Sequence, residues 1–392
     1  MKWSTKKIGE VCDVLPGFAF KSKDLVDSGI PVIKIANITD NYSVNTESTQ
    51  CFPTEFMSER YEKFTLRDGD ILIAMTGATA GKVGRIRCPE DRTFLLNQRV
   101  AKFEPKDIHP DFFWNAISTP RYRTIFYSLG GGAAQPNMSG SQIGSVEVPY
   151  PPFPVQERIA SILSAYDDLI ENNQRRIQLL EQAARLLYRE WFVHLRFPGH
   201  EHVKIEDGVP EGWERKQLGE VVATNQDSYR SQELPDEINY IDISSVKNGR
   251  ILSKTTMHSE MAPGRARRKV HDGDIIWSNV RPNLKGYALV LNPNENDVFS
   301  TGFTVLTPEN IPCSYLFLCV TTEEFVQYLV NHTTGASYPA VRANDFERAE
   351  TLIPSESILK MFDNQAAPIF RLISKLEEES SVLSKARDLL LP

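Results

Sequence analysis

The stretch that decides the fold is residues 155–194, which read VQERIASILSAYDDLIENNQRRIQLLEQAARLLYREWFVH. Its apolar positions recur alternately three and four residues apart, which is the seam of a heptad repeat. The seam comprises Leu163, Tyr166, Ile170, Asn173, Ile177, Leu180, Ala184 and Leu187. A globular helix averages about 11–12 residues, so we predict a long rod here, with an ordinary amphipathic core helix as the alternative.

A second stretch, residues 356–390, has the same pattern. Its seam comprises Ala366, Ile369, Ile373, Leu376, Ser380, Leu383, Arg387 and Leu390. The two seams correspond at an offset of 203 residues, as between Ile170 and Ile373. Polar positions such as Asn173 and Ser380 favour one specified pairing over maximal stability. We therefore predict that the two helices pair with each other and serve as a spacer.

Two further features of the helices each allow two interpretations. Trp191 and Phe192 follow the first seam, and either pack a helix end on its own domain or dock another subunit. Pro368 lies inside the second helix. Because proline removes a hydrogen bond and clashes with the preceding turn, we expect it to kink that helix or displace its beginning.

The sequence before each long helix is repeated. Asp68-Gly69-Asp70-Ile71-Leu72 returns as Asp272-Gly273-Asp274-Ile275-Ile276, 204 residues later. Gly132-Ala133-Ala134-Gln135-Pro136 returns as Gly335-Ala336-Ser337-Tyr338-Pro339, 203 residues later. Apolar runs such as Ile30–Ile35 predict strands in what we expect to be a mixed α/β domain. The order of these landmarks predicts a tandem duplication of a domain followed by a helix.

Composition narrows the class of protein. The 392 residues are 41% hydrophobic and 24% charged, as in ordinary globular proteins, and the net charge is −7. The sequence suggests neither a membrane span nor a secretory signal. Five scattered cysteines favour a reduced, cytoplasmic setting without disulfides or a zinc site. Because proteins that neutralise DNA phosphates alone are usually basic, either DNA is not the ligand, or the basic surface is local, or a partner supplies much of the attraction.

No motif for catalysis is apparent. Residues 77–83 resemble a phosphate-binding loop, but they are one residue short and place Val83 where a magnesium-binding hydroxyl belongs. His200-Glu201-His202 lies in a polar connector without a further ligand nearby, so we predict no metal. No amino-methyltransferase motif and no pairing of a nucleophile with a base stands out. We expect no catalytic residues.

What the sequence does contain are loops rich in groups that recognise nucleic acid. Asn, Gln and Arg make paired hydrogen bonds to base edges, and glycine allows close approach to phosphate. In the first half the candidates for DNA binding are Thr76, Gly77, Thr79, Lys82, Asn97, Gln98, Arg99, Gly131, Gln135 and Asn137. In the second half they are Arg265, Arg267, Arg268, Ser278, Asn279, Arg281, Asn283, Lys285, Thr301, Ser337, Tyr338 and Arg342.

These residues together resemble the specificity subunit of type I restriction–modification systems. The resemblance covers essentially the whole chain and rests on ordered pieces: residues 76–83, 97–100, 135–139, 152–159, 280–283 and 334–342. It implies two target-recognition domains that each read half of a split DNA site, with the long helices forming an antiparallel coiled coil. It also implies two methyltransferase subunits that carry S-adenosylmethionine and restriction subunits that use ATP, so that this chain would bind no cofactor.

The predicted organisation follows. We expect recognition domains at residues 1–154 and 213–355, long helices at 155–194 and 356–392, and a connector at 195–212. Two other functions stay open: a coiled-coil scaffold, and a self-contained DNA-modifying enzyme. The duplicated Gly/Asn/Arg loops count against the scaffold, and the missing motifs count against the enzyme.

Overall fold

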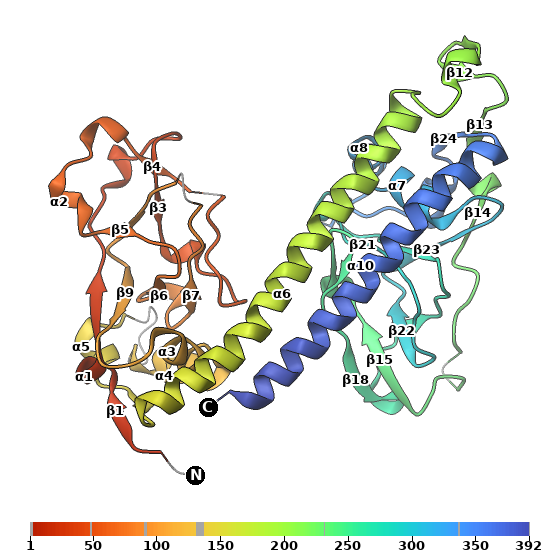
Figure 1. Cartoon of the computed structure of the whole chain (residues 1–392). Coiled ribbons are helices and arrows are strands. Elements are labelled where there is room, and N and C mark those ends of the chain that lie inside the picture. The colour runs from red at the N-terminus through yellow and green to blue at the C-terminus, as the bar shows by residue number, and fades with distance from the viewer. Residues whose placement is uncertain are drawn as a thin grey trace. The chain divides into compact units, whose positions relative to one another are not determined.

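A computed structural model describes residues 3–47, 49–89, 92–130, 137–230, 232–335 and 338–391. The chain divides into two compact units (Figure 1). Unit 1 comprises Met1–Glu171 and Ser381–Pro392, and unit 2 comprises Asn172–Ser380. Each long helix contributes to both units, and each unit is considered by itself below.

Unit 1 is built around two four-stranded sheets. The first has the strand order β2-β9-β6-β7, with β2 Cys12–Pro16, β9 Val100–Pro105, β6 Ile71–Ala74 and β7 Val83–Arg85. The second has the order β4-β3-β8-β5, with β4 Cys51–Phe52, β3 Ile30–Ile33, β8 Phe94–Leu96 and β5 Thr65–Leu66. A separate pair joins β1 Thr5–Lys7 to β10 Glu147–Pro149. The short helices are α1 Ile8–Val11, α2 Glu59–Glu62, α3 Pro110–Ile117, α4 Pro120–Leu129 and α5 Gly140–Gly144.

Unit 2 repeats this plan. Its first sheet has the order β14-β23-β20-β21, with β14 Val222–Thr224, β23 Phe303–Pro308, β20 Ile275–Ser278 and β21 Tyr287–Leu289. Its second has the order β18-β15-β22-β19, with β18 Thr255–His258, β15 Glu237–Ile241, β22 Asp297–Ser300 and β19 Ala266–Arg268. Small pairs join β11 Ile205–Glu206 to β12 Val209–Pro210, β13 Glu214–Gln217 to β24 Glu350–Ile353, and β16 Val246–Lys247 to β17 Arg250–Ile251. Its short helices are α7 Cys313–Cys319, α8 Glu323–Asn331 and α9 Ala343–Glu347.

The two units therefore share sheet order and strand direction. In each second sheet the central pair is parallel, β3 with β8 and β15 with β22. Every other pairing within the four-stranded sheets is antiparallel. Such a match of order and direction confirms the predicted tandem duplication of a mixed α/β domain.

Both long helices predicted from the heptad pattern are present. The helix α6 spans Phe153–Tyr188 and continues as a π-helical turn, Arg189–Val193. The helix α10 spans Glu356–Leu390 and is continuous through Pro368. The expected displacement of its beginning is therefore wrong. The Pro368 side chain is exposed, so the ring at least does not disturb packing against the partner helix.

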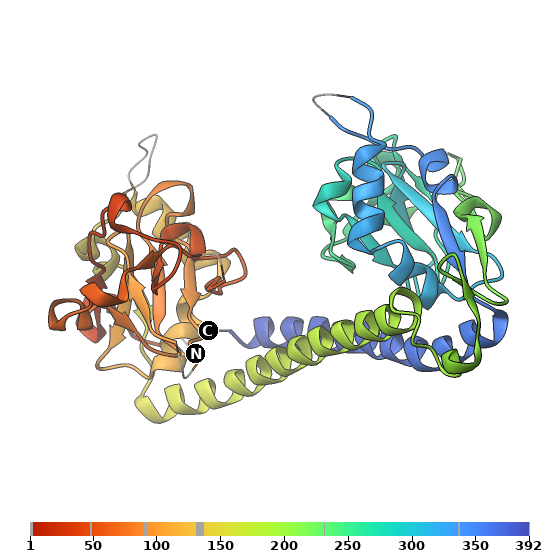
Figure 2. The same ribbon diagram turned by 90° about the horizontal axis from the view of Figure 1, so that it is seen from above.

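The helices run antiparallel. Within unit 2, the ring centroid of Tyr188 on α6 lies 6.3 Å from that of Phe362, near the start of α10. About two turns earlier on α6, Glu181 and Glu377, which lies farther along α10, both pair with Arg250. Within unit 1, Arg387 of α10 donates to Asp167 of α6 at 2.8 Å. Figure 2 shows the two helices side by side in a second view.

Burial follows the predicted seam closely. On α6, Leu163, Ile170, Asn173, Ile177 and Ala184 are buried, and Leu180 and Leu187 are partly buried. On α10, Ile373 and Leu376 are buried, Ile369 and Leu383 are partly buried, and Leu390 is half exposed near the helix end. Ile177 and Ala184 share one core cluster with Ile373 and Leu376 in unit 2.

The aromatic segment after α6 packs inside unit 2. Trp191 and Phe192 are buried there. The Phe192 ring meets Tyr315 of α7 and Phe362 of α10 at centroid distances of 4.9 and 4.8 Å. Of the two roles considered for this segment, these contacts favour the helix end packed on its own domain.

Candidate nucleic-acid interface

The repeated Asp-Gly-Asp turn sets the start of a central strand in each unit. Gly69 and Gly273 adopt positive φ angles of 82° and 86°, which glycine tolerates without strain. The next residue closes the turn: Asp70 accepts from the Arg67 amide at 2.9 Å, and Asp274 accepts from the His271 amide at 2.7 Å. This shared geometry places the β6–β7 and β20–β21 loops at matching positions in the two units.

Burial perturbs both of these turn carboxyls. It raises the pKa of Asp70 and that of Asp274 above the ordinary aspartate value, because desolvation disfavours the charged form. The Asp274 side chain is only 2% exposed. Both carboxyls accept the backbone amide that closes their turn, so their perturbation has a structural origin.

In unit 2 the turn leads into a cluster of four loops joined by backbone hydrogen bonds. The Asn279 amide donates to Gly302 O at 2.8 Å, and the Val341 amide donates to Asn279 O at 2.9 Å. The Thr301 amide donates to Arg265 O at 2.8 Å. The loops that contain the predicted residues 265–268, 278–285, 301 and 338–342 therefore form one continuous surface.

Unit 1 contains the corresponding hydrogen bonds. The Met75 amide donates to Arg99 O, and the Met138 amide donates to Met75 O, both at 2.9 Å. Thr76 and Asn137 form an isolated antiparallel bridge, as Val280 and Ala340 do in unit 2. Loops that are separate in sequence thus come together in the same way twice.

The residues of the unit 1 surface differ in exposure. Gln98, Arg99 and Asn137 are exposed, and Asn97, Gly77 and Thr76 are partly buried. The Oγ1 atoms of Thr76 and Thr79 are buried and have no hydrogen-bond partner among the residues that the structure describes. Lys82 has a largely covered side chain and pairs with Asp40 at 2.9 Å. Gly131 and Gln135, also predicted here, lie outside the described residues.

The cations of the unit 2 surface are held in different ways. Arg265 donates to the Asp242 carboxylate at 2.8 Å and to the Tyr240 hydroxyl at 3.1 Å. The hydrogen bond to that hydroxyl is the main reason that the pKa of the Arg265 guanidinium is raised. Lys285 forms an ion pair with Glu323 of α8.

Arg267 and Arg268 both donate hydrogen bonds within unit 2. Arg267 donates to Ala266 O at 2.7 Å and Arg268 to Ser228 Oγ at 3.1 Å. Burial lowers the pKa of Arg268, and its Nε is buried without a hydrogen-bond partner in the structure. Only part of the Arg268 guanidinium is therefore accessible to a ligand.

Polar side chains brace the same loops from inside. Ser278 is buried and donates to Val280 O at 3.1 Å. Thr304 donates to the Asn279 side chain at 2.6 Å. Asn283, Thr301 and Arg342 are exposed. Ser337 lies outside the described residues.

Arg281 and Tyr338 stand apart on this surface. The Arg281 guanidinium lies 4.9 Å from the centre of the Tyr338 ring, which is the geometry of a cation–π contact. Tyr338 is 65% exposed. The Arg281 amide donates to Pro339 O at 2.8 Å, so the backbone of one loop fixes the other.

Sequence reasoning missed the acidic and phenolic groups that hold the cations. Asp40 forms ion pairs with both Lys82 and Arg123. Arg265 forms an ion pair with Asp242 and donates a hydrogen bond to Tyr240. These partners are far from the cations in sequence, and no local pattern indicates them. Only the sequence repeat, which aligns the loops of the two units, gives any indication of where these partners lie.

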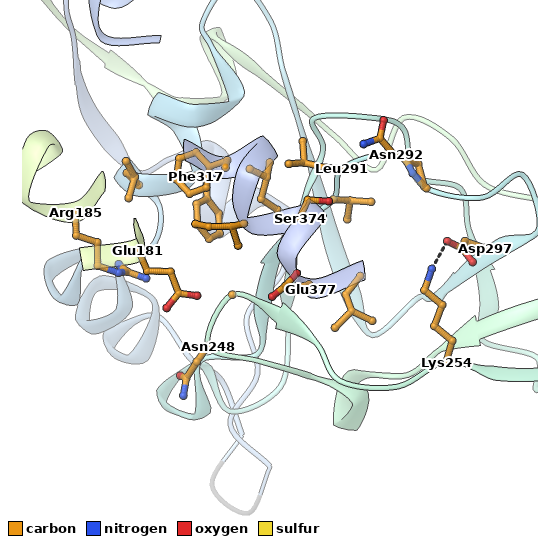
Figure 3. Close-up of a pocket in the computed structure, with 18 residues that line it drawn as sticks. Glu181, Arg185, Asn248, Lys254, Leu291, Asn292, Asp297, Phe317, Ser374 and Glu377 are labelled. Carbon is orange, nitrogen blue, oxygen red and sulfur yellow. Dashed lines mark hydrogen bonds and ion pairs between the residues drawn. The ribbon is translucent and has the colours of Figure 1, made fainter. Parts of the chain in front are cut away.

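A cavity in unit 2 lies beside the long helices and not among these loops (Figure 3). Glu181, Arg185 and Glu377 extend from the helices toward it. Lys254 and Asp297 form an ion pair at its far side. Glu377 has a pKa raised by burial, and Arg250 approaches it at 3.7 Å. These carboxylates form ion pairs with neighbouring cations, as expected at a junction between the long helices and the domain.

Within the described residues, the structure contains no cluster of side chains suited to hold a metal ion. Burial raises the pKa of the Cys12 thiol to about 12 and of Cys88 to about 11, so these thiols are not activated nucleophiles. None of the described helices is long and apolar enough to cross a membrane.

Comparison with known proteins adds an independent line of evidence. Residues 1–182 match the model of the type I restriction modification DNA specificity domain. The type I restriction enzyme MjaIX specificity subunit of Methanocaldococcus jannaschii is 25% identical, covering 100% of this chain and 92% of that protein. The HindI specificity subunit of Haemophilus influenzae is 21% identical, covering 84% of this chain and 86% of that protein.

A solved structure shares the fold. The type I restriction–modification S subunit from M. genitalium aligns with a TM-score of 0.63 at 15% identity, covering 100% of this chain and 95% of that chain. The match extends over both units and both long helices, as the tandem architecture requires. The family model over residues 1–182 and the two full-length relatives agree that the chain is similar to type I restriction–modification DNA specificity subunits.

Proposed function

We propose that this chain is the non-catalytic subunit that selects the DNA sequence for a type I restriction–modification complex. Unit 1 would read one half of a bipartite site and unit 2 the other half. The observation that carries this proposal is the loop cluster built twice with the same backbone hydrogen bonds, as at Met75 and Asn279. A protein that reads two half-sites needs such a surface twice, whereas a scaffold does not.

We propose DNA-binding roles for the exposed members of each cluster. In unit 1 these include Gln98, Arg99 and Asn137, and in unit 2 they include Arg265 and Arg281. Asn and Gln side chains pair a donor with an acceptor, which suits base edges. Arginine donates two hydrogen bonds to a base edge or to a phosphate. Buried members such as Ser278 would shape the loops.

The long helices would act as the spacer between the two recognition surfaces. A helix rises about 1.5 Å per residue, so α6, with 36 residues, is roughly 54 Å long, which is more than one DNA turn of roughly 34 Å. Antiparallel pairing through a mostly apolar seam would keep that length constant. A fixed length would set the number of unread base pairs in the DNA site.

Partners would supply the chemistry. We propose two methyltransferase subunits that bind S-adenosylmethionine, and restriction subunits that use ATP, with no cofactor on this chain. The net charge of −7 fits such an assembly, because partners can provide much of the phosphate contact. Work on cellular DNA would place the complex in the cytoplasm.

Mapping of methylated adenine across a genome tests this function. Cells that express the partner methyltransferase would be compared with and without this chain. We expect a split motif that is methylated only when the chain is present. Unchanged methylation with a demonstrably active partner would contradict the proposal, and methyl transfer by the purified chain alone would favour the self-contained enzyme.

A further inference from the structure

We propose that Arg281 reads a guanine in the half-site bound by unit 2, and that Tyr338 positions its guanidinium for that contact. This inference rests on the proposed DNA-recognition function. It names one base and two residues, and it can fail while that function stands.

Arg281, like Lys285, has a side chain where the duplicate in unit 1 has glycine. The position that corresponds to Arg281 is Gly77, 204 residues earlier, between the equivalent strands β6 and β7, and the position that corresponds to Lys285 is Gly81. Gly77 has a φ of 74° and Arg281 a φ of 50°, so both adopt a left-handed backbone. Glycine adopts this conformation freely, but a residue with a side chain is strained there, at a cost of about 1–2 kcal/mol. Unit 2 therefore retains a side chain where its duplicate has none.

The surrounding loops hold that strained backbone in place. The Arg281 amide donates to Pro339 O at 2.8 Å, and the Leu284 amide donates to Arg281 O at 2.9 Å. The loop with Pro339 is itself closed by reciprocal bonds between Thr334 and Ala340, at 2.9 and 3.0 Å. Strain that its surroundings enforce is typical of functional positions.

The charge of Arg281 is available to a ligand. Arg281 is exposed and takes part in no salt bridge within the described residues, whereas Arg265 and Lys285 on the same surface have carboxylate partners. Its contact is the face of the Tyr338 ring at 4.9 Å. A ring restricts the guanidinium without occupying its N–H groups, so within the described residues these donors stay available.

An arginine fork held in this way matches guanine. Arginine donating to O6 and N7 in the major groove is the commonest specific contact between protein and base. Lysine carries the same charge without the planar fork. A phosphate contact would also use the charge, but would carry no sequence information.

The test compares variants in the complex with the partner methyltransferase, with the methylated motif mapped for each. For Arg281→Ala we expect one guanine, in one half-site, to become degenerate. Competition binding with guanine replaced by adenine or 7-deazaguanine at that position should show the preference for guanine falling roughly 10- to 100-fold. Arg281→Lys should lose the preference and retain more overall affinity, which separates lost reading from lost folding.

Variants of the ring test its positioning role. Tyr338→Ala should lower the guanine preference roughly 2- to 30-fold, and Tyr338→Phe, which keeps the ring face, should retain it. Arg348→Ala, which removes an exposed arginine of the same unit outside the surface, is the control and should change nothing.

The outcomes separate the two hypotheses. A wild-type complex without a split motif would overturn both the proposed function and this inference. A wild-type split motif with equal weakening of all sequences by Arg281→Ala would make Arg281 a phosphate contact, and would overturn this inference alone. An unchanged motif in Arg281→Ala would also overturn this inference alone.

Discussion

At the scale of single residues, the two units use one turn in two contexts. Asp70 and Asp274 both accept the amide three residues earlier, and both have pKa values raised by burial. The repeat in sequence was sufficient to predict equivalent turns, because glycine and aspartate have strong local preferences. It could not predict burial of the carboxyl, which depends on the surrounding core.

Asp274→Asn should stabilise unit 2 at neutral pH relative to acid pH. A carboxyl whose folded pKa is raised costs stability while charged, and that cost disappears as the pH falls through its folded pKa. The amide keeps an acceptor for the His271 N–H and has no charge to desolvate. Chemical unfolding at pH 4 to 8 should show the variant gaining on the wild type as the pH rises.

Asp70→Asn is the matched variant in unit 1 and should behave with the same sign. A wild type that instead gains on either variant as the pH rises would show that the carboxylate is stabilised by its partners, and would contradict the role assigned to burial.

The residues that hold the cations could not be predicted. Lys82 meets Asp40 and Arg265 meets Tyr240, across many intervening residues. The pairing of Arg281 with Tyr338 depends on the same kind of long-range approach. The sequence predicted which loops come together, but not which partners their side chains have.

At the scale of elements, the heptad pattern predicted the long helices because burial recurs with the helical period. The same pattern distinguishes seam from surface on one helix. Ile177 is 2% exposed, and Leu179, two positions along, is 57% exposed.

Ile177→Ala should lower the free energy of unfolding of unit 2 by about 2–5 kcal/mol, because it leaves a cavity in the cluster with Ile373 and Leu376. Leu179→Ala removes a similar side chain from the exposed face and should change it by at most about 0.5 kcal/mol. Denaturant titration measures both. Equal effects would mean that the seam is not where the helices pack.

Pro368→Ala should stabilise α10. The proline lies inside a continuous helix, where it removes one backbone hydrogen bond, and its side chain is exposed. Alanine restores the bond without disturbing the seam, so we expect a gain of up to about 3 kcal/mol. Circular dichroism during thermal unfolding measures it. A loss of stability would indicate that the neighbouring structure requires the proline.

At the scale of the whole molecule, the proposed spacer makes a prediction about DNA. Insertion of one heptad into α6 after Glu171 and another into α10 after Ser380 keeps the seam in register. Each adds about 10 Å, close to three base pairs. The gap in the methylated motif should lengthen.

Four-residue insertions at the same places are the control, because they break the heptad register. They should abolish methylation and not shift the gap. A heptad variant that methylates the original gap would contradict the spacer role of the helices.

The central claim is that each unit reads its own half of the site. The most direct measurement maps the methylated motif of a complex with Gln98→Ala and Arg99→Ala in unit 1, of one with Arg281→Ala in unit 2, and of their combination. We predict that the unit 1 variant alters one half, that the unit 2 variant alters the other, and that the combination alters both. Either single-unit variant altering both halves would contradict independent reading by two duplicated units.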